Sequence, residues 1–98
     1  MSESVQCLQT LDELRTYVNE TLCEYDELQV GAFQFTEQVL VRSGQPCGMM
    51  FRLHGPRRVQ FLAIWETDRN TILFYNSSGE RFQKTQLVAA PRLEAQPA

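Results

Sequence analysis

The chain has few of the residues that define a disulfide scaffold, a metal centre or a membrane span. It contains three cysteines and one histidine in 98 residues, and Cys7, Cys23 and Cys47 lie 16 and 24 positions apart with no C-x-x-C pair. This spacing argues against a disulfide framework and a structural zinc site, so we expect no metal and no cofactor. The longest unbroken apolar run is five residues, from Phe61 to Trp65, whereas a transmembrane helix needs about 20.

The beginning of the chain lacks positive charge. Its first basic residue is Arg15, and no long apolar segment precedes or follows it. A secretory signal combines a basic segment with an apolar segment of about 7–15 residues. We therefore predict a soluble, cytoplasmic protein that does not associate with membranes.

The motifs of common catalytic chemistry are also missing. The chain contains no glycine-rich phosphate loop, no G-x-S-x-G sequence and no cluster of metal ligands. Asp12 and Glu13 are adjacent in the sequence, and adjacent side chains on a helix diverge instead of converging for acid–base work. One imidazole, that of His54, and a cysteine elsewhere in the chain do not define a catalytic pair. The sequence does not favour an enzyme.

A helical pattern is present near the beginning of the chain. Apolar residues recur at steps of three and four, within an arc of about 80° on a helix: Leu11, Leu14, Val18, Leu22 and Tyr25. Thr10 and Glu13 form a capping-box pattern, so we predict an amphipathic helix over residues 10–27. Cys23 lies about 140° from the centre of the apolar stripe. We therefore expect Cys23 to be exposed and Cys7 and Cys47 to be more buried.

Beyond Gly31 the pattern changes to short runs of β-branched and aromatic residues, separated by clusters rich in Gly, Pro, Asn, Asp or Ser. The runs predict strands over residues 33–42, 48–54, 59–66, 71–75 and 81–87. Because the connections are short, we expect an antiparallel meander. The fold class is therefore α+β, with one N-terminal helix packed on about five antiparallel strands that can curve strongly. Residues 1–88 form the domain, and residues 89–98 are expected to be a disordered tail.

The turn at Pro56 and Arg57 predicts which residues lie on each of the two faces of this sheet. If these are the two central turn residues, Phe51 lies opposite Leu62. The helix then covers the face that carries Met49, Phe51, Leu53, Leu62, Ile64, Leu73, Tyr75 and Phe82. The second face carries Met50, Val59, Phe61, Ala63, Trp65, Ile72 and Phe74, interrupted by Arg52 and His54.

An apolar second face needs a cover. Three covers are open: the sheet can close on itself, a second copy or another protein can pack on it, or a concave sheet can hold a small ligand. Our main functional hypothesis is a noncatalytic protein-interaction module, which can be a homodimer, with its interface at Phe61, Trp65, Ile72 and Phe74. The alternative is a domain that binds a small ligand or anion in a concave pocket.

The positive charge gathers in one place. Arg52, His54, Arg57 and Arg58 surround the turn at Pro56 and are candidates for binding an anion or a partner, because arginine forks suit carboxylate and phosphate. Residues 1–37 hold eight acidic side chains and one basic one, whereas residues 38–98 hold eight basic and four acidic ones. A net charge of −3 and the absence of a recognisable motif do not favour nucleic acid as the partner.

Overall fold

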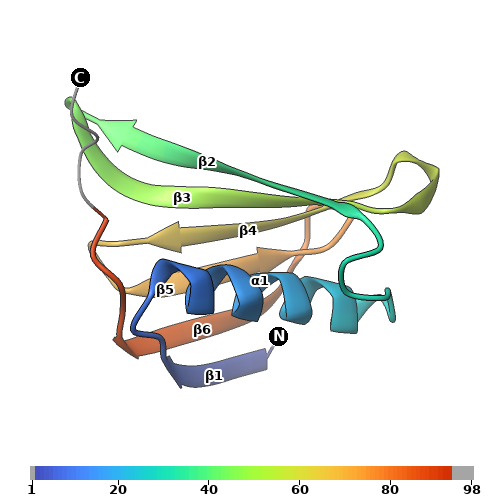
Figure 1. Cartoon of the computed structure of the whole chain (residues 1–98), viewed down its shortest axis with the longest axis horizontal. Helices are drawn as coiled ribbons and strands as arrows, with labels where there is room; N and C mark the ends of the chain where they lie inside the picture. The colour runs from blue at the N-terminus through green and yellow to red at the C-terminus, as the bar shows by residue number, and fades with distance from the viewer. Residues whose placement is uncertain (1, 94–98) are drawn as a thin grey trace.

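One helix lies against one face of a six-stranded sheet (Figure 1). The computed structural model describes residues 2–93. Helix α1 spans Leu11–Tyr25. The strands are β1 (Ser2–Cys7), β2 (Gln34–Arg42), β3 (Gln45–His54), β4 (Gln60–Glu66), β5 (Thr71–Tyr75) and β6 (Arg81–Ala89), with a short 3-10 helix η1 (Pro56–Arg58) between β3 and β4. The α+β class is confirmed, and each of the five predicted strands is present.

The sheet has six strands instead of five, in the order β1-β6-β5-β4-β3-β2. From β2 to β6 it is the expected antiparallel meander, whereas β1 lies parallel to β6. The sequence of β1, Ser-Glu-Ser-Val-Gln-Cys, contains one β-branched residue, Val5, and carries little strand signal of its own. Its pairing is supplied by a segment about 80 residues further along the chain, which local patterns cannot reveal.

Helix α1 begins where its sequence predicts, and three residues of the predicted apolar stripe are fully buried. Thr10 is the N-cap, and its side chain and that of Glu13 form the reciprocal hydrogen bonds of a capping box. Leu14, Val18 and Leu22 are fully buried, whereas Tyr25 is 47% exposed. The Tyr25 ring instead stacks on Phe82 of β6, with 3.8 Å between the ring centroids.

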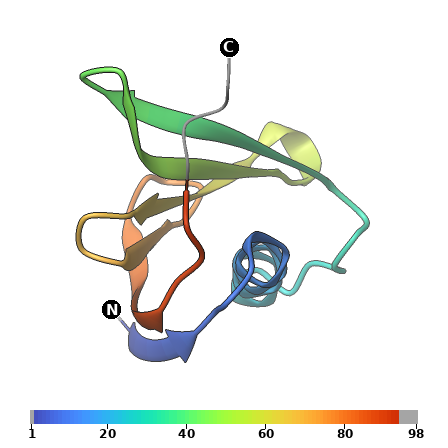
Figure 2. The same cartoon turned by 60° about the vertical axis from the view of Figure 1, so that its left-hand side comes forward.

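The sheet curves around the helix. Figure 2 shows α1 nearly end-on within the concave side of the sheet, with β1 and β2 at opposite edges. The two edge strands do not pair with each other, so the sheet is not closed into a barrel. The concave side is filled by side chains of α1, of strands β3–β6 and of Leu8, which lies between β1 and α1. The core residues are Leu8, Leu14, Val18, Leu22, Cys23, Met49, Phe51, Leu53, Phe61, Ala63, Trp65, Ile72, Phe74 and Leu87.

The predicted assignment of the two sheet faces is wrong for β4 and β5. Phe51 lies opposite Ala63, one residue away from the predicted partner Leu62. The cause is the connection between β3 and β4, where Gly55 and Val59 are linked by a backbone hydrogen bond of 2.9 Å around the three residues of η1. One additional turn residue shifts the register by one and exchanges the faces of the strand that follows.

The observed register places the bulkier side chains in the core. Phe61, Trp65, Ile72 and Phe74, predicted to lie on the second face, are at most 2% exposed and belong to the core beneath α1. Leu62, Ile64, Leu73 and Tyr75, predicted to contact the helix, lie on the other face. Burial of three large aromatic rings removes more apolar surface from water than burial of the alternative set.

Strand β1 is joined to the domain by a cluster of hydroxyl groups. Thr85 Oγ1 lies 2.8 Å from both Ser4 Oγ and Tyr17 OH, and these last two oxygens are 3.1 Å apart. The Gln83 side-chain amide donates to Thr85 Oγ1 at 3.1 Å and to Tyr17 OH at 3.2 Å. Each hydroxyl can donate to the next around the triangle, so polar groups from β1, α1 and β6 satisfy one another.

The cysteines lie in other environments than expected. Cys23 is fully buried and Cys7 is exposed, so both predictions are wrong, whereas Cys47 is half-buried. Leu28 and Phe33, from the connection between α1 and β2, pack against the core that contains Cys23. This connection widens the buried side of the helix beyond the stripe that its own sequence shows.

The packed part of the chain continues past the boundary expected at residue 88. Ala89 belongs to β6, and Ala90 and Leu93 pack against the core. Residues 94–98 of the expected tail lie outside the described residues. Across residues 2–93, α1 is the one α-helix, and it is too short and too polar to cross a bilayer.

Candidate functional site

The face of the sheet turned away from α1 carries an apolar strip that we call the outer strip. It consists of Met50 on β3, Leu62 and Ile64 on β4, and Leu73 and Tyr75 on β5, and each of these side chains is half-buried. The register aligns Met50, Ile64 and Leu73 across the three strands, and it aligns Leu62 with Tyr75. The central strands therefore present a continuous apolar surface, which no helix of the described residues covers.

Polar side chains surround the outer strip. Arg52 lies beside Leu62, and His54 lies beside Gln60, in the register of β3 and β4. His54 Nε2 is 3.1 Å from Thr36 Oγ1 of β2. On the other side, Lys84 of β6 is aligned with Leu73. An apolar centre with a polar rim is the usual anatomy of a protein-binding surface.

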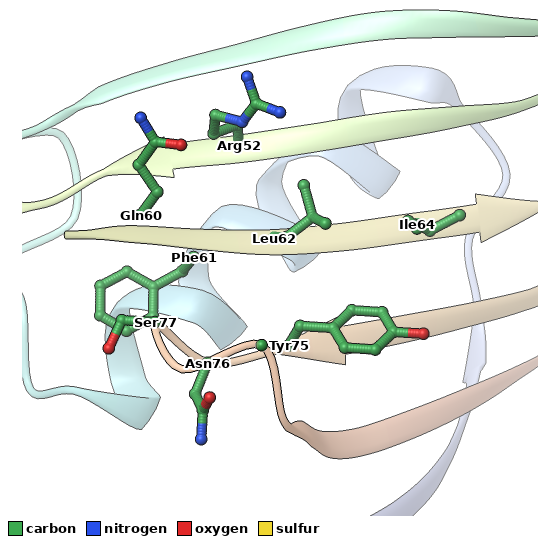
Figure 3. A pocket seen from close by; sticks show the side chains of 9 residues that line it. Arg52, Gln60, Phe61, Leu62, Ile64, Tyr75, Asn76 and Ser77 are labelled. Carbon is green, nitrogen blue, oxygen red and sulfur yellow. The ribbon is translucent and has the colours of Figure 1, made fainter.

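A depression of about 460 Å³ lies at one end of the outer strip (Figure 3). Its position is set by the ends of β3, β4 and β5 and by the turn that follows β5. The nine lining residues are Arg52, Gln60, Phe61, Leu62, Ile64, Tyr75, Asn76, Ser77 and Gly79. One of them is a cation and none is a carboxylate. Figure 3 shows Arg52 and Gln60 on one side of Leu62, and Tyr75 on the other.

Asn76 shapes the turn that borders the depression. Its side-chain oxygen accepts hydrogen bonds from the backbone N–H of Ser78 at 2.9 Å and of Glu80 at 3.0 Å. Its amide nitrogen lies 3.4 Å from Tyr25 OH. The Asn76 side chain is therefore occupied in holding the turn, and the polar groups left to meet a ligand are those of Arg52, Gln60, Tyr75 and Ser77.

Arg52 differs from two other arginines of the domain. Arg15 contacts Asp12 and Glu37, and Arg42 contacts Asp68. Within residues 2–93, the guanidinium of Arg52 has neither a carboxylate within 4.0 Å nor a hydrogen bond to another protein group. It is half-buried on an apolar surface, where a cation is less well solvated than in open water.

The structure brings together only part of the predicted cationic site. Arg52 and His54 lie on the outer face, and Arg52 lines the depression. Arg57 and Arg58 are exposed on η1 and do not line it. Both have positive φ angles, 58° and 64°, a conformation that residues other than Gly, Asn and Asp rarely adopt.

The sequence did not predict most of the residues around the depression, because Leu62, Ile64 and Tyr75 were expected on the face of the sheet that the helix covers. The signal that could have corrected this is the size of the side chains. One register buries Trp65, Phe61 and Phe74 together, and the other exposes all three.

The described residues hold no group of three His, Cys, Asp or Glu side chains that could bind a metal ion. Burial raises the pKa of the Cys23 thiol above its ordinary value, which keeps it in the protonated, weakly nucleophilic form at neutral pH. The Cys23 Sγ atom lies 3.5 Å from Asn19 Oδ1 of the same helix. Among residues 2–93, no basic side chain contacts this thiol to convert it into a nucleophile.

Comparison of the chain with protein-family models, with curated proteins and with solved structures finds no match in any of the three. The site must therefore be interpreted from its own geometry.

Proposed function

We propose that this domain is a noncatalytic protein-interaction module that binds its partner through the outer strip. The observation that carries the proposal is the contrast between the two faces of the sheet. Helix α1 buries one face. The other face carries an apolar surface formed by Met50, Leu62, Ile64, Leu73 and Tyr75, and no helix among residues 2–93 covers this surface.

The charge distribution supports a partner of a particular kind. Arg52 and Lys84 flank the outer strip, and Arg57 and Arg58 project from the adjacent turn. The acidic residues Asp12, Glu13, Glu20 and Glu24 are exposed on α1, which lies against the opposite face of the sheet. The complementary partner is therefore a protein surface with apolar residues at its centre and carboxylates around them.

A face-to-face dimer is less well matched to this surface. It would bring the Arg52 and Lys84 side chains of two copies onto one interface while leaving both acidic helices outside. We therefore choose a different protein as the occupant, and self-association becomes a measurable outcome of the test.

The test compares substitutions on and off the outer strip. Leu62→Asp and Ile64→Asp place a charge on it, and Val30→Asp is a matched control at a position that is 52% exposed in the connection after α1. Proteins captured from an extract by the wild type would be purified, and each would be titrated by calorimetry against the wild type, Val30→Asp and the two strip variants. We expect affinity about tenfold or more weaker for each strip variant, because a charge in the centre of an interface is left unpaired.

Two outcomes would overturn the proposal. Equal affinity of the purified partner for all four proteins would show that the outer strip is not the binding surface. A wild-type dimer in sedimentation that Leu62→Asp separates into folded monomers would identify a second copy as the occupant, in place of a different protein. Circular dichroism of each variant establishes that it is folded.

A further inference from the structure

We infer that the depression beside Arg52 is a carboxylate-binding subsite, which receives an acidic side chain of the partner together with a neighbouring apolar side chain. This inference rests on the proposed function and specifies the chemistry of its binding surface. It requires that the depression can accept a negative charge, that its floor can accept an apolar group, and that its polar groups are free.

The negative charge is accommodated by Arg52. The guanidinium offers five N–H donors in a planar fork that matches the two oxygens of a carboxylate. Among the residues that the structure describes, Arg52 has no ion pair, although Arg15 has two and Arg42 has one. None of the nine lining residues is acidic, so an incoming carboxylate meets no opposing negative charge within the depression. Glu66, on the same face, lies at the other end of β4 from Gln60.

The apolar group is accommodated by Leu62, Ile64 and Tyr75. These three side chains line the depression and are half-buried already, so an apolar group placed on them removes further surface from water on both sides. The volume of about 460 Å³ is in the range of small ligand sites, which is roughly 300–1,000 Å³, and is larger than a single acidic side chain needs.

The remaining polar groups can position the carboxylate. The Tyr75 hydroxyl and the Gln60 amide have no hydrogen-bond partner among residues 2–93, and both side chains line the depression. Figure 3 shows Gln60 on the same side of Leu62 as Arg52, whereas the Tyr75 hydroxyl lies below Ile64. The Gln60 amide can therefore donate a hydrogen bond to a carboxylate held by Arg52, and the Tyr75 hydroxyl offers a separate donor toward the apolar end of the depression. Because Asn76 is held by its turn, the rim opposite Arg52 is fixed before a ligand arrives, which lowers the cost of ordering it.

The probes for this subsite are blocked tripeptides, acetyl-Leu-Glu-Phe-amide and its glutamine counterpart, together with free 3-phenylpropionate. Each would be titrated into the full chain while nuclear magnetic resonance records the Arg52 Nε–H signal and the methyl signals of Leu62 and Ile64. We expect the glutamate peptide to shift all three sets of signals with a dissociation constant on the order of millimolar, as the size of the peptide allows. The glutamine peptide should bind about tenfold or more weakly, because it cannot form a charge-assisted fork.

Three variants separate the role of Arg52 from general electrostatic attraction. Arg52→Gln should lose the preference for glutamate over glutamine, and Arg52→Lys should retain part of it, since a lysine keeps the charge without the fork. Arg69→Gln removes a cation at the turn between β4 and β5, outside this depression, and should leave the preference unchanged.

Equal binding of the two peptides to the wild type would overturn the carboxylate subsite. Binding of 3-phenylpropionate without binding of the glutamate peptide would also overturn it, by showing that the depression takes a free small acid. Neither result tests whether the outer strip binds a protein, because Leu62→Asp and Ile64→Asp test that surface with the purified partner. The two proposals can therefore fail separately.

Discussion

Arg15 of α1 and Glu37 of β2 are joined by two parallel N–H···O hydrogen bonds, 2.6 Å from Nε to Oε1 and 2.8 Å from Nη2 to Oε2. The third guanidinium nitrogen, Nη1, donates to Asp12 at 2.8 Å. Glu37 belongs to β2, one of the two edge strands of the sheet. This pair therefore connects the helix to a strand that pairs with another strand on one side only. The hydrogen bonds that Arg15 donates to the Glu37 carboxylate raise the pKa of Arg15, so the guanidinium stays charged throughout the pH range in which the protein is folded.

A double-mutant cycle on this pair measures its contribution. We expect a coupling free energy of about 0.5–1 kcal/mol between Arg15→Gln and Glu37→Gln, because both side chains are partly solvated and the geometry is bidentate. Urea denaturation of the wild type, both single variants and the double variant provides the four free energies. The coupling should decrease at high salt, and additive single effects would show that the pair does not stabilise β2.

The buried stripe of α1 predicts large losses on truncation. Leu14→Ala and Leu22→Ala each remove a fully buried side chain, and we expect each to lower the free energy of unfolding by about 2–5 kcal/mol. Val30→Ala is the control, with an expected change within about 0.5 kcal/mol. If denaturation shows that both leucine variants lower the free energy of unfolding by less than this value, α1 does not pack in the core.

The three cysteines should differ in reactivity in the order of their exposure. Cys7 should react first with a thiol reagent under native conditions, and Cys23 last, because Cys23 is buried and its thiol pKa is raised. A raised pKa in the folded state stabilises the fold below the unfolded pKa of about 8.5, and this contribution is lost as the pH rises through the folded value. Wild-type stability should therefore decrease above this pH more steeply than that of Cys23→Ala. Labelling of Cys23 before Cys7 would contradict the structure.

Trp65 is the single tryptophan of the chain and is fully buried. We expect its fluorescence to shift to longer wavelength on unfolding and to resist soluble quenchers in the native state. Trp65→Asp should prevent folding, since it places an unpaired charge in the core. Trp65→Phe should be tolerated far better, because the indole N–H has no hydrogen-bond partner among the described residues and phenylalanine removes that buried donor. A folded Trp65→Asp protein would contradict the observed register.

The turn at η1 predicts a gain in stability on substitution by glycine. Arg57 and Arg58 both have positive φ, which costs an L-residue on the order of 1 kcal/mol or more, whereas glycine adopts it freely. Arg57→Gly and Arg58→Gly should each raise the free energy of unfolding by up to about 1 kcal/mol. Arg69→Gly, at a position where φ is not positive, should give no gain. If both turn variants have a lower free energy of unfolding than the wild type, the left-handed conformation of the turn is wrong, and so is the register of β4 that depends on it.

The predictable parts of the fold were those set by short stretches of sequence. Thr10 and Glu13 determine where α1 begins, and Thr71–Tyr75 was predicted to the residue, because capping and alternation act between near neighbours. The face assignment failed because it depended on a single turn residue, and one residue more at η1 exchanged Leu62 and Tyr75 for Trp65 and Phe74. Of the residues of the candidate site, Arg52 and His54 were correctly predicted to lie on the outer face, because the inward and outward alternation of side chains along β3 was predicted correctly.

The parallel pairing of β1 with β6 has a consequence for the order in which the protein can assemble. During synthesis the residues of β1 emerge before those of β2–β5, yet the strand that pairs with them, Arg81–Ala89, is made after β2–β5. Until then Ser4 and Tyr17 have no Thr85 to complete their hydroxyl triangle. The hairpins from β2 to β6 form from neighbouring segments, whereas closing β1 onto β6 joins segments about 80 residues apart in the chain, and contacts of such long range form slowly. Strand β1 should therefore be the last element to dock. Hydrogen exchange after a folding pulse should show protection of the backbone amides of β1 later than of those of β4.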